Sequence, residues 1–198
     1  IHRVLSAEAR IDGSDLRCRQ LEDAQWQSIA AVTSRIEQME LLIQDSGISN
    51  IGAITGLARQ WHQQHRIGCL FVDYIQLIGS HGENRQLEVA DISKKLKNLA
   101  KDLQIPVVAL SQLNRATEHR TDGKPKLADI RDSGAIEQDA DIVLLLYRPG
   151  NYSEDADDSE IELIIAKNRM GAIGKVDLVF EPTFALYREP QYWNVEER

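Results

Sequence analysis

Short apolar runs that alternate with longer amphipathic stretches constrain the fold of this chain most strongly. Apolar residues fill 69–72, 107–110 and 142–146 and dominate 161–166, where Glu162 is the exception, and each run has the length of a strand. Strands that are apolar on both faces, as 69–72 is, are typical of a parallel sheet that is covered on both sides. The order of the runs therefore predicts an α/β fold, with a mainly parallel sheet and helices on both of its faces.

The stretches before and between these runs have helical periodicity. Apolar residues recur at helical spacing in 23–39, 50–66 and 84–104, so a helix is expected in each. Pro106 blocks continuation of the third helix and starts the next strand. The buried face of that helix is expected to consist of Leu87, Ile92, Leu96, Leu99 and Leu103.

Two further strands are expected outside this alternation. Residues 41–43 (Leu-Leu-Ile) predict a brief strand, and 175–180 predicts the outer strand of a C-terminal β-hairpin after a glycine-flanked turn. The chain has no internal repeat and no low-complexity linker. We therefore expect 1–198 to be part of a single domain, in which 182–198 forms a tail without an assigned role.

Bulk properties exclude several classes of protein. No apolar run approaches the roughly 18 residues of a membrane span, so no membrane partner is expected. Cys18 and Cys69 are too few for a disulfide framework and too far apart for a zinc pattern, which suits a cytoplasmic location. The formal net charge of −8 does not by itself suggest a nucleic-acid partner.

Polar residues follow three of the apolar runs directly. Asp73 follows the first run, Ser111 and Gln112 follow the second, and Lys167, Asn168 and Arg169 follow the fourth. Ligands of open parallel sheets bind beyond the carboxyl ends of the strands. An acid, an amide and two cations at one rim suit a nucleotide with Mg²⁺. Taken alone, Asp73 is equally compatible with a turn or a helix cap, Gln112 is more typical of a surface amide, and Lys167 and Arg169 are common on a solvated edge strand.

Five segments, in order along the chain, resemble motifs of the DnaB family of replicative DNA helicases. These are a Walker B motif at 71–77, the start of the next helix at 83–89, a γ-phosphate-sensing motif at 109–115, a DNA-loop motif at 129–141 and an arginine-finger segment at 165–171. The matches occur at nearly the spacing of the family. The chain therefore resembles a RecA-like motor domain, and its function is expected to be that of an ATP-dependent helicase that translocates on single-stranded DNA and unwinds the duplex at the replication fork.

The resemblance implies a role for each residue that matches a family motif. Asp73 would order Mg²⁺ through its water shell, and Gln112 would report the γ-phosphate of ATP. Lys167 and Arg169 would reach the ATP of the neighbouring subunit in a homohexamer. Arg3 would pack on the adenine base.

A second group of matching residues concerns DNA and protein partners. Arg115, Asp132 and Gly134 would hold the backbone of single-stranded DNA, Gly134 through its main chain. One arginine and one backbone N–H per subunit, in six copies around a channel, would concentrate a small total charge where the phosphates pass, which would explain binding by an acidic protein. The resemblance also implies a primase and a helicase loader as partners.

One departure from the family concerns the phosphate-binding loop. No G-x-x-x-x-G-K-[ST] occurs in the 198 residues, so we expect the chain to begin after the P-loop and the strand that follows it. The 198-residue chain alone is therefore expected to be inactive, neither binding ATP tightly nor hydrolysing it.

Two alternative interpretations remain. The chain could be a RecA-like binding or scaffold module that has lost its P-loop, although the retained Asp73, Gln112, Lys167 and Arg169 argue against this. It could also be a recombination ATPase of the RecA or RadA type, although the contiguous match at 129–141 favours the helicase.

Overall fold

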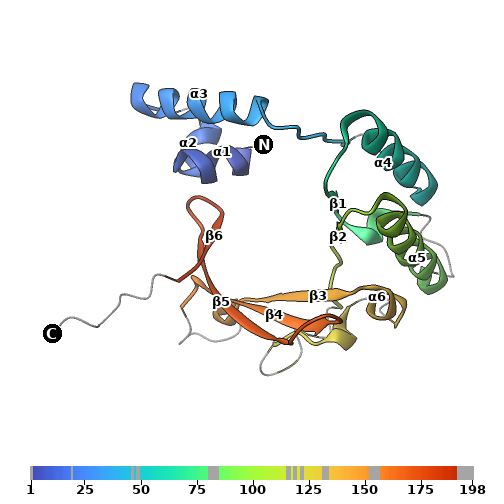
Figure 1. The fold of residues 1–198 in the computed structure, drawn as a ribbon. Helices are drawn as coiled ribbons and strands as arrows, with labels where there is room; N and C mark the ends of the chain where they lie inside the picture. Colours follow the sequence, from blue (N-terminus) through green and yellow to red (C-terminus); the bar gives the residue numbers. More distant parts are fainter. Residues whose placement is uncertain are drawn as a thin grey trace. The chain divides into compact units, whose positions relative to one another are not determined.

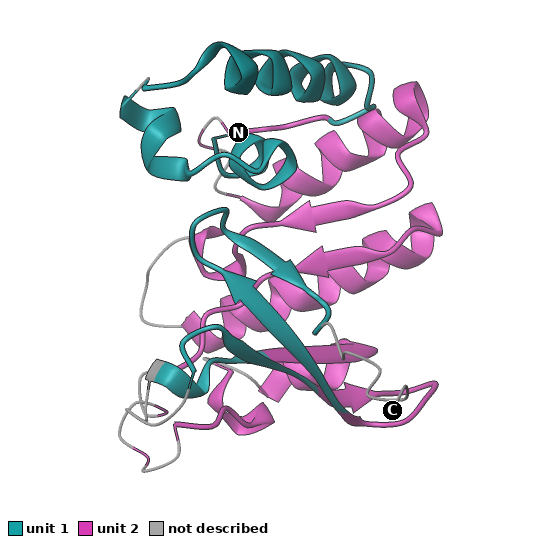
Figure 2. Cartoon of the chain, turned by 90° about the vertical axis from the view of Figure 1, so that its left-hand side faces the viewer, with its two compact units in different colours: residues 1–41, 146–164, 175–198 teal, residues 42–145, 165–174 magenta. Residues whose placement is uncertain are grey.

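The computed structural model describes residues 2–18, 20–45, 47, 50–79, 85–114, 117, 120, 123–130, 134–151 and 157–190. The chain divides into two compact units (Figure 2). Unit 1 consists of 1–41, 146–164 and 175–198, and unit 2 consists of 42–145 and 165–174.

Unit 2 holds the parallel strands and three α-helices (Figure 1). Its elements are α4 (Ile51–His65), β1 (Leu70–Val72), the 3-10 helix η1 (Ile75–Leu77), α5 (Arg85–Leu103), β2 (Val107–Ala109), η3 (Leu127–Asp129) and α6 (Gly134–Asp139). β1 pairs with β2 in parallel, with Leu70 opposite Val107 and Val72 opposite Ala109. α5 packs against β2, α4 and α6. The predicted α/β class with parallel strands is therefore confirmed.

The helices of unit 2 have clear end signals. The side chain of Asn50 caps α4 by accepting a hydrogen bond of 2.8 Å from the backbone N–H of Ala53. Arg66 ends the same helix in the left-handed conformation, at φ 53°. Gln104 follows α5 with φ 55°, directly before Ile105 and Pro106. The predicted helices at 50–66 and 84–104 are confirmed within a residue or two of their ends, and Asn84 lies outside the described residues.

The buried face of α5 differs from the predicted face at its N-terminal end. Val89, Ile92, Leu96 and Leu99 are buried, whereas Leu87 is 71% exposed. Leu87 precedes Ile92 by five residues, which places it well around the helix from a face that repeats every three or four residues. The prediction that Leu87 is buried is therefore wrong, and Val89 takes its place in the core.

In the described part of unit 1, a hydrogen bond connects the helices of residues 2–37 to the turn at 182–185. These helices are α1 (His2–Ala9), α2 (Gly13–Cys18) and α3 (Asp23–Glu37), the last of which confirms the helix predicted at 23–39. Ser6 is buried, and its hydroxyl donates to the carbonyl of Ile11 at 2.6 Å. The backbone N–H of Gly13 donates to the carbonyl of Thr183 at 3.2 Å. The turn at 182–185 is thereby anchored to the start of α2.

The remaining strands form one sheet in the order β3, β4, β5 and β6. They span β3 (Ile142–Tyr147), β4 (Glu160–Asn168), β5 (Gly174–Glu181) and β6 (Leu186–Arg188). β6 is antiparallel to β5, and the rings of Phe180 and Tyr187 lie 4.7 Å apart across the pair. The C-terminal antiparallel group is confirmed, but β5 is not its outer strand. Ala185, at φ 51°, lets the chain turn back, so part of the expected tail becomes the edge strand.

Residues 41–43 do not form the predicted strand. They lie in no helix or strand, and the side chains of Leu41 and Ile43 are exposed. None of the described strands pairs with them, and a strand without a hydrogen-bonded neighbour is not stable.

Candidate functional site

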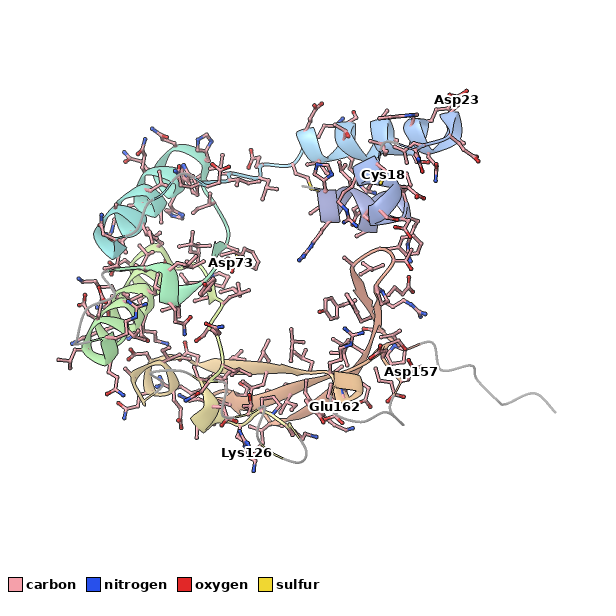
Figure 3. All side chains as sticks on the ribbon, turned by 180° about the vertical axis from the view of Figure 1, so that it is seen from behind. Cys18, Asp23, Asp73, Lys126, Asp157 and Glu162 are labelled. Atoms are coloured by element: carbon pink, nitrogen blue, oxygen red, sulfur yellow. The ribbon has the colours of Figure 1, made fainter. Side chains whose placement is uncertain are left out.

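The carboxyl ends of β1 and β2 form a common rim in unit 2. Leu110 donates its backbone N–H to the carbonyl of Val72 at 2.9 Å, and Ile75 donates to the carbonyl of Leu110 at 3.0 Å. The chain therefore turns from β1 towards the end of β2. Asp73 lies where β1 ends (Figure 3) and has an exposed carboxylate, and the Asp73–Tyr74 peptide is cis.

Gln112 is held at this rim by the buried side-chain amide of Gln76, a residue to which the sequence analysis assigns no role. The side chain of Gln76 in η1 donates to the hydroxyl of Ser111 at 2.8 Å and accepts from the backbone N–H of Gln112 at 3.1 Å. Gln76 is only 8% exposed, so both hydrogen bonds are largely shielded from water. The parallel pairing of β1 with β2 thus places Asp73 and Gln112 at the same edge, and the side chain of Gln76 fixes the backbone at Gln112.

The first residue of α5 fixes the main chain around Gln76. The guanidinium of Arg85 donates to the carbonyl of Gln76 at 2.7 Å and to the carbonyl of Ile78 at 3.0 Å. It also forms an ion pair of 2.8 Å with Glu88 in the next turn of α5. The only signal for this arrangement in the sequence is a polar residue, Gln76, inside an otherwise apolar run.

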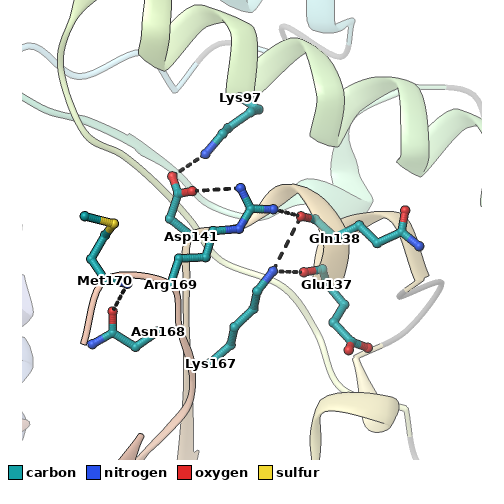
Figure 4. A network of polar contacts seen from close by, with 8 residues as sticks. All are labelled: Lys97, Glu137, Gln138, Asp141, Lys167, Asn168, Arg169 and Met170. Carbon is teal, nitrogen blue, oxygen red and sulfur yellow. Dashed lines mark hydrogen bonds and ion pairs between the residues drawn. The ribbon is translucent and has the colours of Figure 1, made fainter. Parts of the chain in front are cut away.

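Lys167 and Arg169 lie against α6 (Figure 4). Lys167 lies inside β4 instead of after it, and its ammonium donates to the carbonyls of Glu137 and Gln138. Arg169 follows β4 and donates to the carbonyl of Gln138 and to the carboxylate of Asp141. Within the part of the chain that the structure describes, their polar partners are therefore on α6 and Asp141 instead of the rim formed by β1 and β2.

The residues predicted to contact DNA follow two short stretches of chain, 113–114 and 129–130, that pair with each other. Leu113 and Ile130 form an isolated antiparallel bridge, and Asn114 donates its backbone N–H to the carbonyl of Asp129 at 2.6 Å. Gly134 is the exposed first residue of α6. Arg115 and Asp132 lie outside the described residues.

Other predicted properties concern the adenine, the metal and the membrane. Arg3 is exposed on α1 and belongs to unit 1, whereas Asp73 and Gln112 belong to unit 2. No three His, Cys, Asp or Glu residues among those described are placed to hold a metal ion together. A single exposed carboxylate such as Asp73 fits Mg²⁺, which keeps several waters and takes few protein ligands.

None of the described helices is both long and apolar enough to cross a membrane.

Comparison of the sequence with known families and curated proteins gives a consistent result. A model of the DnaB-like helicase C terminal domain matches residues 1–189. The replicative DNA helicase DnaB of Geobacillus stearothermophilus is 41% identical over 184 residues, which are 91% of this chain and 40% of that protein. The DnaB of Mycobacterium leprae is 45% identical over 174 residues, which are 86% of this chain and 29% of that protein. The chain thus spans less than half the length of these relatives.

Two solved structures share the fold at 30% sequence identity, each with a TM-score of 0.87 over 96% of this chain. One is a DnaB-like replicative helicase described with its interactions with primase, of which this chain covers 48%. The other is described as an ATPase domain, of which this chain covers 69%. On the match over 1–189 and these similarities, the chain belongs to the family of DnaB-like helicase C-terminal domains.

Proposed function

We propose that this chain is part of a hexameric, ATP-dependent replicative helicase that translocates on single-stranded DNA and unwinds the duplex at the replication fork. Family membership supports the proposal, as do relatives of 38–45% identity that are named replicative DNA helicases. The observation that carries it is the common rim, where Asp73 follows β1 and Gln112, held by Gln76, follows the paired strand β2.

The rim is proposed to bind ATP with Mg²⁺. ATP bound there would supply the phosphoryl group, which would pass to water with ADP as the leaving group. The exposed carboxylate of Asp73 orients waters of the metal shell, because Mg²⁺ dehydrates reluctantly. The amide of Gln112 hydrogen-bonds a phosphate oxygen or the attacking water. Arg3 stacks its guanidinium on the adenine ring, which is a favourable contact for a planar cation.

Lys167 and Arg169 are proposed to act on the nucleotide of a neighbouring subunit. Arg169 is half exposed, with 48% of its side chain accessible, so its guanidinium can exchange partners. Positive groups at this position stabilise the charge that spreads over the phosphoryl oxygens in the transition state. The two residues point to the same side, as expected of positions two apart on an extended chain.

The segments bridged by Leu113 and Ile130 are proposed to hold single-stranded DNA in the channel of the ring. Arg115 and Asp132 contact the backbone there, and Gly134 contributes its main chain. Contacts with primase and with a helicase loader, and a cytoplasmic location, are part of the same proposal, and family membership supports them.

The test is the substitution Arg169→Ala in the complete hexameric protein. Loss of a group that acts on transition-state charge lowers turnover far more than affinity, so DNA-stimulated ATP hydrolysis is expected to fall by about a thousandfold or more. ATP binding and ring assembly are expected to stay unchanged. Arg59→Ala, which removes an equally exposed arginine from α4, is the matched control.

A mixing experiment separates a motor from a scaffold. Rings assembled from Arg169→Ala and Asp73→Asn subunits contain some interfaces with an intact arginine and an intact carboxylate, so part of the activity is expected to return. Wild-type hydrolysis by Arg169→Ala alone would refute action on the neighbouring nucleotide and would leave the scaffold interpretation standing.

A further inference from the structure

A polar network joins the end of β4 to the C-terminal turn of α6 (Figure 4). One terminal nitrogen of Arg169 donates to the carbonyl of Gln138, and the other lies 3.3 Å from Oδ1 of Asp141. The backbone N–H of Arg169 also donates to the carbonyl of Asp141 at 2.9 Å. The last carbonyls of a helix have no partner within it and carry partial negative charge, so a cation is stabilised there.

Asp141 has a second cationic partner. Its other oxygen, Oδ2, accepts from Lys97 of α5, whose side chain is 19% exposed. This hydrogen bond lowers the pKa of Asp141 below its usual value, and the charge of Arg169 acts in the same direction. Asp141 is therefore a carboxylate at neutral pH, placed between two cations from different elements.

The contacts of Arg169 involve both of its terminal nitrogens. These are the nitrogens that a guanidinium uses to grip a phosphate group bidentately. A full contact with the nucleotide of another subunit therefore requires that Asp141 and the Gln138 carbonyl be released. Release of Arg169 costs little free energy at Asp141, because Lys97 remains as its partner and the carboxylate is not left unpaired.

We propose that Asp141 is a positioning residue that holds Arg169 within its own chain, in competition with the nucleotide of the neighbouring subunit. The inference rests on the proposed function of Arg169. α6 begins at Gly134, in the segment proposed to contact DNA, so a shift of α6 moves the Gln138 carbonyl that helps to hold Arg169. Binding of DNA thereby favours release of the arginine, and Asp141 limits hydrolysis in the absence of DNA.

The first test is Asp141→Asn in the complete hexameric protein. The amide can still accept a hydrogen bond but has no charge, so Arg169 is held less firmly. DNA-independent ATP hydrolysis is expected to rise about two- to fivefold, the range that loss of a half-exposed ion pair allows. The KM for ATP is expected to stay unchanged, and the stimulation by single-stranded DNA is expected to shrink in proportion.

Asp102→Asn is the matched control. Asp102 is 55% exposed and forms an ion pair with Arg59 at 3.0 Å, much as Asp141 is 56% exposed and pairs with Arg169. This substitution removes the same charge from an ion pair between α5 and α4 that includes none of the residues of the network. It is expected to leave both basal hydrolysis and DNA stimulation at wild-type values.

Lys97→Met provides a variant with the opposite expected sign. The methionine keeps the apolar stem of the lysine but has no charge. Of the two ion pairs that Asp141 forms in the network, only the one with Arg169 is then left. Basal hydrolysis is expected to fall and the ratio of stimulated to basal hydrolysis to rise. If the substitutions only damage the fold, the basal and the DNA-stimulated rates of ATP hydrolysis fall together in both Asp141→Asn and Lys97→Met. That result would overturn the inference.

Combined variants separate this inference from the proposed function. The gain of Asp141→Asn must vanish in Asp141→Asn/Arg169→Ala if it depends on the released arginine. If Arg169→Ala abolishes hydrolysis but Asp141→Asn leaves the basal rate unchanged or lowers it, the holding role of Asp141 is wrong and the proposed function stands. If Arg169→Ala hydrolyses ATP like the wild type, the proposed function of the arginine itself fails.

Discussion

Gln76 is the residue that connects the two halves of the candidate nucleotide rim. Gln76 is only 8% exposed, and its side-chain amide donates a hydrogen bond to the hydroxyl of Ser111 and accepts one from the backbone N–H of Gln112. A buried donor that loses its acceptor bears the full cost of having left water. The position of Gln112 therefore depends on a side chain that does not itself lie at the end of a strand.

Replacement of Gln76 by leucine is expected to destabilise the fold and to disturb the rim. Gln76→Leu leaves the N–H of Gln112 without its acceptor, which costs about 1–3 kcal/mol in the free energy of unfolding. Ser111→Ala leaves that contact in place, so its effect is expected to be smaller. Urea unfolding of both variants measures the difference, and an equal or larger loss for Ser111→Ala would show that the Gln76–Gln112 contact contributes little.

Strand-end residues could be predicted from the sequence, but their side-chain partners could not. Asp73 and Gln112 each follow an apolar run, and the parallel pairing of β1 and β2 brings them to one edge. Gln76 and Asp141 find their partners through tertiary packing, over 36 residues for Gln76 and Gln112 and 28 for Asp141 and Arg169. Neither pairing leaves a periodic or local signal in the sequence.

At the scale of elements, helix existence was predicted better than helix orientation. Asn50, whose side chain caps α4, and Pro106, which cannot continue a helix, mark helix ends through local chemistry that a sequence displays, whereas the left-handed conformation of Arg66 is not a signal that its residue type provides. The rotation of α5 about its axis depends instead on its neighbours α4, α6 and β2. A leucine near the start of a helix cannot be assigned to the core until the packing of those neighbours is known.

The orientation of α5 gives a paired stability prediction. Leu99 is fully buried and Leu87 is 71% exposed, although the periodicity placed both on one face. Leu99→Ala is expected to lower the free energy of unfolding by about 2–5 kcal/mol, because it removes core contacts and leaves a cavity. Leu87→Ala is expected to change it by less than about 0.5 kcal/mol. Denaturant unfolding of the two variants checks the rotation, and comparable losses would restore the face predicted from the sequence.

At the scale of the whole molecule, the net charge of −8 of these 198 residues has to be reconciled with the proposed polyanionic partner, single-stranded DNA. Many cations in the described part of the chain are already paired with its own carboxylates, including Lys97 with Asp141 and Arg188 with Glu181. Such pairs release few counterions when DNA approaches. The proposed binding of single-stranded DNA would then rest on a small number of local contacts, repeated around the proposed ring, and not on a general positive field.

This reasoning predicts a modest salt dependence that a single arginine controls. In the complete protein, Arg115→Ala is expected to weaken binding of single-stranded DNA without changing sequence preference or the affinity for ATP measured without DNA. The slope of log affinity against log salt concentration is expected to become shallower by about 0.7 for each phosphate contact that is lost. Arg59→Ala removes the same charge from an exposed position on α4 and is expected to leave the slope unchanged. Fluorescence anisotropy titrations across a salt series distinguish the two variants. Parallel salt lines for Arg115→Ala and the wild type would place Arg115 outside the DNA path, because a lost phosphate contact cannot leave counterion release unaltered.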